Sequence, residues 1–325
     1  SLAKSVSKEI RLKRNDLVID IGANDGTLLS NYKRGRLIGF EPSNLCPKEK
    51  KSGILWVNDF FDSKLLSKSD IGSASAVTTI AMFYYLEDPV SFAEMIKSVL
   101  APDGIWVCEM NYALDMIDHC SFDHISHEHV TVWSASQFNI VVQKIGLQIF
   151  RIERNELNGG SIRFWMGQAG LRPVEKSVRA VFAKEKGRFT SRDWSKFARE
   201  VRKASTDLNK IVTKLHKSDK SVMVYGASTR GLTILGASKL NAKLIDAAVE
   251  RNPEKVGRFY GATGIPVISE DKMRSSTPNA LLILPYSFIK EFVKRERAYL
   301  KEGGIFVVPL PEPEMITKSS KGATL

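Results

Sequence analysis

Short runs of apolar and β-branched residues alternate with polar segments through the first half of the sequence. The runs cover Leu17 to Ile21, Leu37 to Phe40, Ile54 to Val57, Ala76 to Ile80 and Ile105 to Glu109. Continuous apolar runs of this length are typical of strands that are buried on both faces. Strands that alternate with segments of helix length predict an α/β domain, in which helices cover both faces of a parallel sheet.

Two further runs, Leu147 to Glu153 and Ser161 to Met166, flank the sequence Asn158-Gly159-Gly160. Glycine and asparagine tolerate the backbone conformations of tight turns. We therefore expect an antiparallel pair of strands at the edge of the sheet.

A different period follows from Ser191 to His216. Here the apolar residues recur every three or four positions and basic residues lie between them: Trp194, Phe197, Val201, Ala204, Leu208, Ile211 and Leu215. This period predicts one long amphipathic helix. A connector that packs its apolar stripe on a domain is favoured over a helix that binds nucleic acid.

The strand pattern then starts again, with runs at Val222 to Tyr225, Leu244 to Val249, Ala280 to Leu284 and Ile305 to Val308. The joint Leu100-Ala-Pro-Asp-Gly-Ile-Trp-Val107 also has a counterpart in Leu300-Lys-Glu-Gly-Gly-Ile-Phe-Val307. Two tandem Rossmann-like units are the simplest account, although convergence between α/β domains gives the same pattern. We expect a first domain over residues 1–170, a helical connector over 171–218 and a second domain over 219–325.

The chain has 48 basic and 36 acidic residues, a net charge of +12. Such a balance suits an anionic partner, which includes nucleic acid, a membrane surface and a small molecule that carries a diphosphate. Between Arg172 and Lys220 there are 15 basic and 6 acidic residues, so +9 of the charge lies in one stretch. This concentration favours a solvated connector over a nucleic-acid footprint.

Other compositional features exclude several classes. No apolar run approaches the roughly 20 residues that cross a bilayer, and the N-terminus has no signal-peptide core, so we expect a cytoplasmic protein without a membrane partner. Cys46, Cys108 and Cys120 are too few and too scattered for a disulfide framework or a zinc knuckle.

The first candidate binding site follows the first strand, in Val18-Ile-Asp-Ile-Gly-Ala-Asn-Asp-Gly-Thr27. Gly22 and Gly26 remove Cβ atoms that would keep a ligand from the strand end, and a helix that begins near Thr27 would present free N–H groups. The spacing lacks the Gly-x-Gly-x-x-Gly and Lys-Ser/Thr signatures of NAD and ATP sites. Glu41 ends the second strand, where a carboxylate can accept from both ribose hydroxyls.

This combination resembles the S-adenosylmethionine (SAM)-dependent methyltransferase superfamily. The resemblance implies that the turn with Asp20, Gly22, Asn24 and Gly26 cradles the methionine part of SAM and that Glu41 holds its ribose. It further implies that Asp59 and Phe60 lie along the adenine, and that the loop Ala81-Met82-Phe83 lies near the sulfonium.

Three of the five histidines lie in Ser121-Phe-Asp-His-Ile-Ser-His-Glu-His-Val130. A metal site on His124, His127 and His129 is one interpretation, but the spacing is not His-Glu-x-x-His, and alternate residues of a strand point to opposite faces. A surface loop is another. We favour acid/base chemistry, because histidine titrates near neutral pH and a neighbouring carboxylate, here Glu128 beside His129, can orient it.

Five motifs in order resemble the deoxysugar C-methyltransferases, which methylate the carbon next to the keto group of a nucleotide-diphospho-4-keto-6-deoxysugar. They are Phe122-Asp-x-Ile-x-x-Glu-His129, Leu157-Asn-Gly-Gly-Ser-Ile-Arg163, Tyr225-Gly-Ala-x-x-Arg-Gly231, Arg251-Asn-Pro-x-Lys-x-Gly257 with Ile265-Pro-Val267, and Gly303-Gly-x-Phe-x-Val-Pro-Leu-Pro311. The similarity runs from about Leu17 to Glu312, nearly the whole chain.

The resemblance implies that His129 is the general base and Glu128 its partner. It implies further that the substrate cleft is lined by Asn158, Ser161 and Arg163, that Tyr225 to Gly231 form a phosphate-facing loop, and that Arg230 binds the diphosphate. Asn252 and Lys255 are weaker candidates for the same cleft, since a charged turn before a strand explains them equally well. The two domains would close over a shared crevice.

Two departures from the family pattern bear on the substrate. Members usually carry an N-terminal cysteine-rich zinc module, and the sequence contains none. Ser126 stands where the family commonly has a tyrosine that helps to hold the keto sugar, so we expect Ser126 to act on the substrate through water or at closer range. A methyltransferase of nucleic acid or another small molecule, and a non-catalytic relative that binds nucleotide sugars, are the alternatives.

Overall fold

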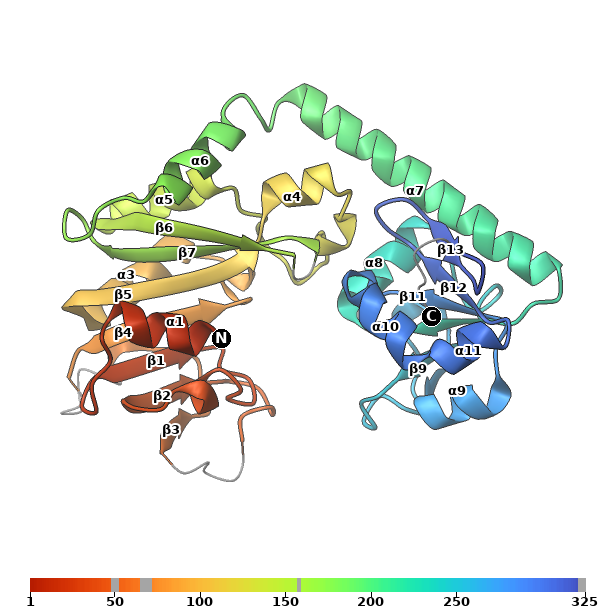
Figure 1. Ribbon diagram of the computed structural model, residues 1–325, viewed down its shortest axis with the longest axis horizontal. Coiled ribbons are helices and arrows are strands. Elements are labelled where there is room, and N and C mark those ends of the chain that lie inside the picture. Colours follow the sequence, from red (N-terminus) through yellow and green to blue (C-terminus); the bar gives the residue numbers. More distant parts are fainter. Residues whose placement is uncertain (48–52, 65–71, 157–158, 321–325) are drawn as a thin grey trace. The chain divides into compact units, whose positions relative to one another are not determined.

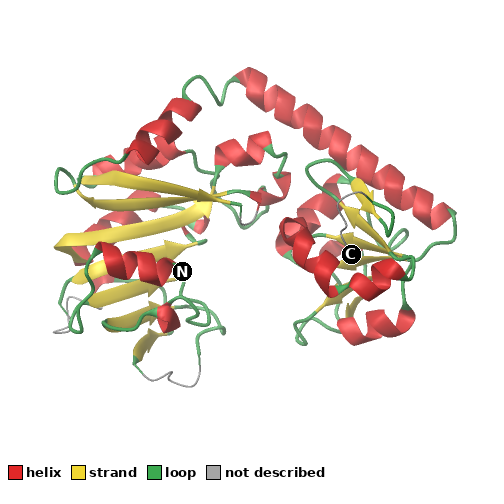
Figure 2. Cartoon of the chain, viewed as in Figure 1, coloured by secondary structure: helices red, strands yellow, loops and turns green. Residues whose placement is uncertain are grey.

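The computed structural model describes residues 1–47, 53–64, 72–156 and 159–320 (Figures 1 and 2). The chain divides into two compact units. The first unit consists of Ser1–Ala113, Glu128–Asn155 and Gly160–Arg188, and the second of Leu114–His127, Glu156–Gly159 and Phe189–Leu325. Each unit is described separately below.

A seven-stranded sheet forms the centre of the first unit. Its strands are β1 (Leu17–Ile21), β2 (Arg36–Phe40), β3 (Ile54–Val57), β4 (Ala74–Ile80), β5 (Leu100–Asn111), β6 (Leu147–Asn155) and β7 (Ser161–Gln168). The order is β3-β2-β1-β4-β5-β7-β6, and the first five strands run parallel. β7 is antiparallel to both β5 and β6, so the expected antiparallel pair at the sheet edge is confirmed.

Helices cover both faces of this sheet (Figure 2). They are α1 (Leu2–Glu9), α3 (Pro89–Val99), α5 (Ala135–Lys144) and α6 (Lys176–Glu185), with short 3-10 helices η1 (Leu29–Asn31) and η2 (Phe83–Tyr85). On one face, Val6 of α1 packs in a cluster with Val18 and Val107. On the other, Phe138 of α5 lies against Trp106, with ring centroids 5.6 Å apart. Neighbouring strand residues thus serve opposite faces, as the pleat requires.

The prediction of a helix from Thr27 onward is wrong. The segment between Gly26 and β2 forms only the single 3-10 turn η1. Arg36 already begins β2, so the chain has too few residues here for an α-helix and its return to the sheet. N–H groups presented by a helix are therefore no part of this site.

The second unit repeats the parallel arrangement. Its strands are β8 (Val222–Tyr225), β9 (Ala247–Glu250), β10 (Val267–Ser269), β11 (Ala280–Ile283), β12 (Ile305–Val308) and β13 (Glu314–Ile316). The order is β10-β9-β8-β11-β12-β13, with β13 antiparallel to β12. The strand expected from Leu244 begins only at Ala247, because Leu244 and Ile245 donate their N–H groups to the Asn241 carbonyl in a turn.

Helices also lie on both sides of the second sheet (Figure 1). The helices assigned to the second unit are α4 (Ala113–Asp118), η3 (Phe122–His124), α7 (Ser191–Lys217), α8 (Thr229–Ala237), η5 (Gly261–Thr263), α9 (Glu270–Ser276), η6 (Tyr286–Phe288), α10 (Ile289–Arg295) and α11 (Arg297–Lys301). When the strands of each unit are numbered from its own first strand, both sheets have the order 3-2-1-4-5, and antiparallel strands are added beyond the fifth. The expected pair of tandem Rossmann-like units is confirmed.

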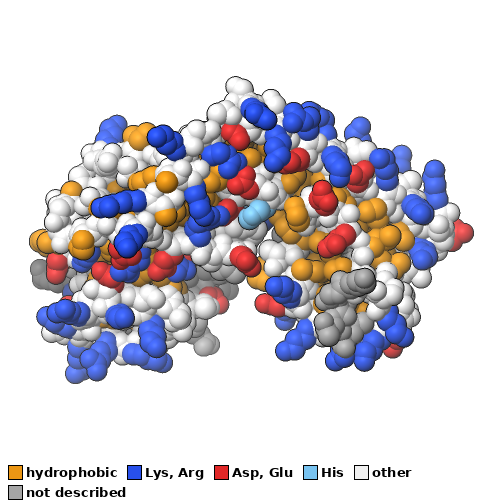
Figure 3. Space-filling model, turned by 45° about the horizontal axis from the view of Figure 1, so that its top comes forward, with side chains coloured by type: hydrophobic (Ala, Val, Ile, Leu, Met, Phe, Trp, Pro, Cys, Tyr) orange, Lys and Arg blue, Asp and Glu red, His pale blue; other side chains and the backbone are white. Residues whose placement is uncertain are grey.

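The long amphipathic helix is confirmed as α7. It begins at a capping box, in which Thr190 and Asp193 exchange bonds between side chain and backbone N–H. Its apolar stripe is buried in the second unit: Phe197, Ala204, Leu208, Val212 and Leu215. Its lysines and arginines are exposed, and basic side chains are scattered over the face of the molecule in Figure 3. None of the helices in the described ranges is long and apolar enough to span a membrane.

The stripe of α7 predicts an asymmetric response to substitution. Leu208 is 1% exposed, so Leu208→Ala should lower the free energy of unfolding by about 2–5 kcal/mol, through lost burial and a residual cavity. Lys214→Ala, on the exposed side of the same helix, should change it by less than about 0.5 kcal/mol. Chemical denaturation followed by circular dichroism measures both. Equal effects of the two substitutions would show that the stripe does not stabilise the unit.

Candidate active site

The carboxyl edge of the first sheet begins with Gly22, directly after β1. Its φ is +73°, in the region that favours glycine, and its N–H donates to the Phe40 carbonyl at 2.9 Å. A Cβ atom on Gly22 would lie 3.3 Å from the Met82 side chain. The glycine thus lets the turn after β1 approach the loop after β4. Gly26 allows an equally close contact, because a Cβ there would lie 2.6 Å from the Trp56 ring.

Glu41 follows β2 and is only 8% exposed. Its Oε2 accepts from the Asn24 N–H at 2.8 Å and its Oε1 from the Ser43 N–H at 3.0 Å. Asn24 reaches this position with a φ of +52°, so its backbone holds the carboxylate in place. Each carboxylate oxygen has a second lone pair, and the pair of oxygens can therefore accept from a vicinal diol.

Asp20 lies within β1 and is 3% exposed. Burial, together with the charge of Glu41, raises its pKa to about 7, although the bond from the Thr78 hydroxyl acts in the opposite direction. That bond joins Thr78 Oγ1 to Asp20 Oδ1 at 2.6 Å. Asp20 therefore changes its protonation near neutral pH, at the strand end that leads into the glycine turn.

The other residues predicted for the cofactor lie in loops of the same unit. Ala81 follows β4 with a φ of +56° and donates its N–H to the Glu109 carbonyl at 2.8 Å. Asp59 follows β3 and accepts from the Phe60 N–H at 2.7 Å, and the Phe60 ring is 75% exposed. The contacts of Asp59 and Phe60 with adenine stay predictions.

His129 packs against the short helix that follows β4. Its ring centroid lies 4.3 Å from that of Tyr84 and 5.5 Å from that of Tyr85. The Thr131 N–H donates to the Tyr84 carbonyl at 3.3 Å, which ties the histidine loop to η2. His129 is half-buried, and Glu128 beside it is exposed.

The three clustered histidines do not share one environment. His124 is buried in η3, His127 is exposed, and both belong to the second unit, whereas His129 belongs to the first. The segment is a 3-10 helix followed by turns, so our expectation that strand alternation separates the histidines is wrong. Within the described ranges, no three His, Cys, Asp or Glu side chains are grouped in a way that could hold a metal ion.

Arg163 and Ser161 lie in β7, in the first unit. The Arg163 guanidinium contacts two carboxylates, with Nε 2.6 Å from Glu109 Oε2 and Nη1 2.8 Å from Glu153 Oε2. Ser161 is 3% exposed at the start of the strand. Asn158 lies outside the described residues, so its predicted place in the substrate cleft is not tested.

Arg230, predicted to bind a diphosphate, lies in the first turn of α8 and forms an ion pair with the buried Asp123 of η3. The Tyr286 hydroxyl also donates to Asp123, at 2.9 Å. Sequence reasoning missed Asp123 and Tyr286, although Asp123 stands inside the histidine-rich motif. Ser126 is 7% exposed, and its Oγ has no hydrogen-bond partner among the described residues.

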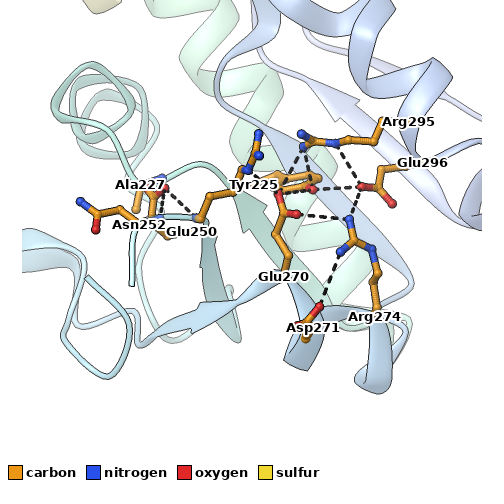
Figure 4. Close-up of polar contacts among 10 residues, drawn as sticks. Tyr225, Ala227, Glu250, Asn252, Glu270, Asp271, Arg274, Arg295 and Glu296 are labelled. Carbon is orange, nitrogen blue, oxygen red and sulfur yellow. Dashed lines mark hydrogen bonds and ion pairs between the residues drawn. The ribbon is translucent and has the colours of Figure 1, made fainter. Parts of the chain in front are cut away.

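Tyr225 ends β8 inside a network of charged groups (Figure 4). Its hydroxyl lies 2.8 Å from Glu270 Oε1 and 3.0 Å from Glu296 Oε1, and it accepts from Arg295 Nη2 at 2.7 Å. Burial is the main cause that raises the Tyr225 pKa, and the carboxylates add to it. Asn252 is exposed and donates its N–H to Glu250 Oε1 at 3.2 Å.

Comparison with known proteins decides the family. A family model described as a methyltransferase domain matches residues 2–152, and one described as a C-methyltransferase C-terminal domain matches residues 156–311. The chain belongs to the C-methyltransferases. It is 26% identical to C-methyltransferase NovU of Streptomyces niveus, over 96% of this chain and 76% of that protein.

Two solved structures are similar to about half of this C-methyltransferase. One belongs to a complex of the Haloferax volcanii Trm112 methyltransferase activator with a methyltransferase, at 18% identity and a TM-score of 0.42, over 51% of this chain and 88% of that chain. The other is the plantazolicin methyltransferase BpumL, at 12% identity and a TM-score of 0.39, over 51% of this chain and 81% of that chain.

The C-methyltransferase uses SAM as its methyl donor. The residues at the carboxyl edge of the first sheet fit this cofactor. Gly22 provides a backbone approach without a side chain, and Glu41 provides a buried diol acceptor that backbone N–H groups hold in place. Asp20 provides a buried carboxyl group beside them. These residues would hold the methionine and ribose parts of SAM.

The raised pKa of Asp20 predicts a pH-dependent stability. A carboxyl group whose pKa is higher in the folded chain contributes stability below its unfolded value of 3.8, and this contribution is lost as the pH rises to about 7. Asp20→Asn removes the titration. The free energy of unfolding of the wild type, relative to Asp20→Asn, should therefore fall by on the order of 4 kcal/mol from pH 4 to pH 8. An unchanged difference across this range would contradict the assignment.

The Glu41 geometry predicts a charge-dependent cofactor affinity. Glu41→Gln keeps the shape but replaces a charged acceptor, so the Kd of S-adenosylhomocysteine (SAH) should rise by about tenfold or more. Isothermal titration calorimetry measures this constant. Glu94→Gln, on the exposed surface of α3, is the matched control and should leave it unchanged. A Glu41→Gln protein that binds SAH with wild-type affinity would remove Glu41 from the cofactor site.

Proposed function

We propose that this enzyme methylates the carbon next to the keto group of a nucleotide-diphospho-4-keto-6-deoxysugar, with His129 as the general base. The membership in the C-methyltransferases supports transfer to carbon. The order of the five sequence motifs, from Phe122 to Pro311, supports the keto sugar as the acceptor.

One observation carries the role of His129. Its ring lies 4.3 Å from Tyr84, in the segment that directly follows β4. The carboxyl end of β4 is the strand end that Gly22 approaches through Met82, so the imidazole belongs to the same edge of the sheet as the proposed cofactor residues. A proton acceptor for C-methylation must act at that edge, since the methyl group is delivered there.

The chemistry needs a base because a carbon next to a ketone is not itself nucleophilic. The neutral His129 imidazole takes the α proton, and the electrons of the C–H bond move into the carbonyl group to give an enolate. Bound SAM supplies a methyl group on a sulfonium, an electrophile that needs no further activation. The enolate carbon is then the nucleophile for the methyl group that SAM, held at Gly22 and Glu41, would supply, and the proton stays on His129.

The neighbours of His129 suit the charged form that results. Glu128 supplies a carboxylate next to it in the sequence, and an opposite charge favours an imidazolium ion. The Tyr84 ring, tilted 44° to the imidazole, presents an aromatic surface to it, and such surfaces attract cations. Both groups lower the cost of holding the proton after it leaves the sugar.

We assign binding of the nucleotide sugar mainly to the second unit, with Arg230 on the diphosphate and the Ser126 hydroxyl on the sugar. Guanidinium has five N–H donors in a planar fork, and the ion pair with Asp123 runs through Nη2. The buried Ser126 Oγ makes no hydrogen bond to a described residue, so a substrate or a bridging water can use it. Ser161, Arg163, Tyr225 and Asn252 are proposed in supporting roles in substrate binding.

Incubation with isotopically labelled SAM and a panel of nucleotide-diphospho keto sugars tests the proposal. Mass spectrometry of the sugar should show a methyl group on carbon, next to the keto position. Methyl transfer to oxygen, or to an acceptor without a nucleotide, would overturn it.

His129→Asn tests the base. We expect methyl transfer to fall by about 10²–10⁴-fold, because general base catalysis is lost, while SAH binding stays unchanged. A second readout isolates the proton step: in D₂O with SAH bound, the wild type should exchange the α hydrogen of the keto sugar, and His129→Asn should not.

His127→Ala is the matched control for this experiment, since His127 is an exposed histidine of the same motif. It should exchange and methylate at wild-type rates. If His129→Asn retains hydrogen exchange, another group is the base and the proposed mechanism falls.

A further inference from the structure

The second unit contains a counterpart of the glycine turn in the cofactor unit. Gly226 directly follows β8 with a φ of +89°, as Gly22 follows β1 with a φ of +73°. Gly226 donates its N–H to the Val249 carbonyl, and Gly22 donates its N–H to the Phe40 carbonyl, each at 2.9 Å. In both units an acidic residue directly follows the residue that accepts. The two turns therefore share a left-handed glycine and the same hydrogen bond to the neighbouring strand.

The acidic residues that follow are held alike. Glu250, at the end of β9, accepts at Oε2 from the Ala227 N–H at 3.3 Å, as Glu41 accepts from the Asn24 N–H at 2.8 Å. The other oxygen of each carboxylate accepts from the backbone N–H two residues further on, at 3.2 and 3.0 Å, and Glu250 Oε1 also accepts from the Arg251 N–H at 2.8 Å. In the first unit this arrangement suits the ribose diol of SAM. The similar arrangement around Glu250 therefore suits a second ribose diol.

A pocket lies at this edge of the second sheet. It has a volume of about 340 Å³, and its lining includes Gly226, Glu250, Arg251, Phe288 and Arg295. Figure 4 shows Glu250 beside Ala227 and Asn252, and Arg295 beside Tyr225. Crevices at the carboxyl ends of parallel strands, where the strand order reverses, are the usual ligand sites of such sheets, and β8 lies at that reversal.

Glu250 is a charged acceptor at neutral pH. Burial tends to raise its pKa, but the N–H groups of Asn252 and Arg251 and the ammonium of Lys255 outweigh burial and lower the pKa below its ordinary value. The contacts to Oε2 are long, 3.3 Å from the Ala227 nitrogen and 3.4 Å from Lys255 Nζ. Lys255 Nζ has a shorter bond to the Ala227 carbonyl, at 2.9 Å, so an arriving hydroxyl competes only with weak contacts at Oε2.

Groups for the rest of a nucleotide line the same pocket. The Phe288 ring is 37% exposed and can stack on a base. The Arg251 side chain is 73% exposed and can reach a diphosphate. Arg251 Nε lies 3.9 Å from Glu270 Oε1, at the limit of an ion pair. An acid for a diol, a ring for a base and this exposed cation for phosphate together match a nucleoside diphosphate.

We infer that this pocket binds the nucleoside of the substrate, and that Glu250 accepts hydrogen bonds from both the 2′- and the 3′-hydroxyl of its ribose. The inference rests on the proposed function in taking the ligand to be a nucleotide sugar. It follows that the enzyme selects ribonucleoside diphosphate sugars over their 2′-deoxy counterparts, because a deoxyribose leaves one of the two bonds to a charged acceptor unmade.

Calorimetry on the full chain tests this inference, with SAH present at saturation so that the cofactor site is filled. The probes are UDP, CDP, GDP and ADP, each paired with its 2′-deoxy form, and dTDP. At least one ribonucleoside diphosphate should bind about tenfold or more tightly than its 2′-deoxy form. Equal affinities within every pair, or no binding of any probe, would overturn the inference.

Glu250→Gln should weaken the preferred ribonucleoside diphosphate by about tenfold and bring the ratio of ribo to deoxy affinities close to one, with SAH binding unchanged. Glu291→Gln, another acid of the same pocket, is the control and should keep the ratio. A ratio that survives Glu250→Gln would reject Glu250 as the diol acceptor. Unchanged SAH affinity and melting temperature establish that the variant is folded.

Turnover separates this inference from the proposed function. If 2′-deoxynucleotide and ribonucleotide keto sugars are methylated with equal kcat/KM, the proposed function stands and the inference fails. If ribonucleoside diphosphates bind in a Glu250-dependent way and no nucleotide sugar is methylated, the inference stands and the proposed function fails.

Discussion

A glycine in the left-handed region, hydrogen-bonded across to the neighbouring strand, determines the geometry of both sheet edges. Gly22 and Gly226 turn the chain away from the first strand of each unit while their N–H groups hold the second strand in register. This places a glutamate directly beside backbone donors from both loops. A larger residue would need a strained backbone and would crowd the loop after the fourth strand, at Met82 or Pro285. The geometry of both proposed binding sites depends on this one turn.

Much of this architecture can be predicted from hydrophobic periodicity, because buried parallel strands are nearly continuous apolar runs. β1, β3, β8 and β12 have the bounds that their runs indicate, and α7 differs by one residue at its end. The failures have local causes. The segment after Gly26 is too short for a helix, and the turn at Asn241 delays β9 although Leu244 and Ile245 are apolar. Apolar composition alone cannot distinguish a turn that is buried from a strand.

The site was less accessible to sequence reasoning than the fold. Glu41 is predicted as a ribose acceptor because it follows a glycine turn at the expected spacing, whereas Glu250, which lies after Gly226 in a similar way, stands in no motif that marks it as a diol acceptor. The partners of Arg230 were also unpredictable, since Asp123 lies 107 residues away in the sequence. Local motifs reveal which residue types are present, but long-range pairing depends on how helices such as α8 and η3 pack.

The interleaving of the two units along the chain affects any attempt to divide the protein. Residues 114–127 belong to the second unit although they precede β6 and β7 of the first. A fragment that starts at α7 would therefore lose η3, and with it the buried carboxylate that pairs with Arg230 and Tyr286. An arginine and a tyrosine packed against an absent partner would leave polar groups unsatisfied. Chimeric enzymes that exchange the second unit should thus transplant residues 114–127 together with the segment from Phe189 onward.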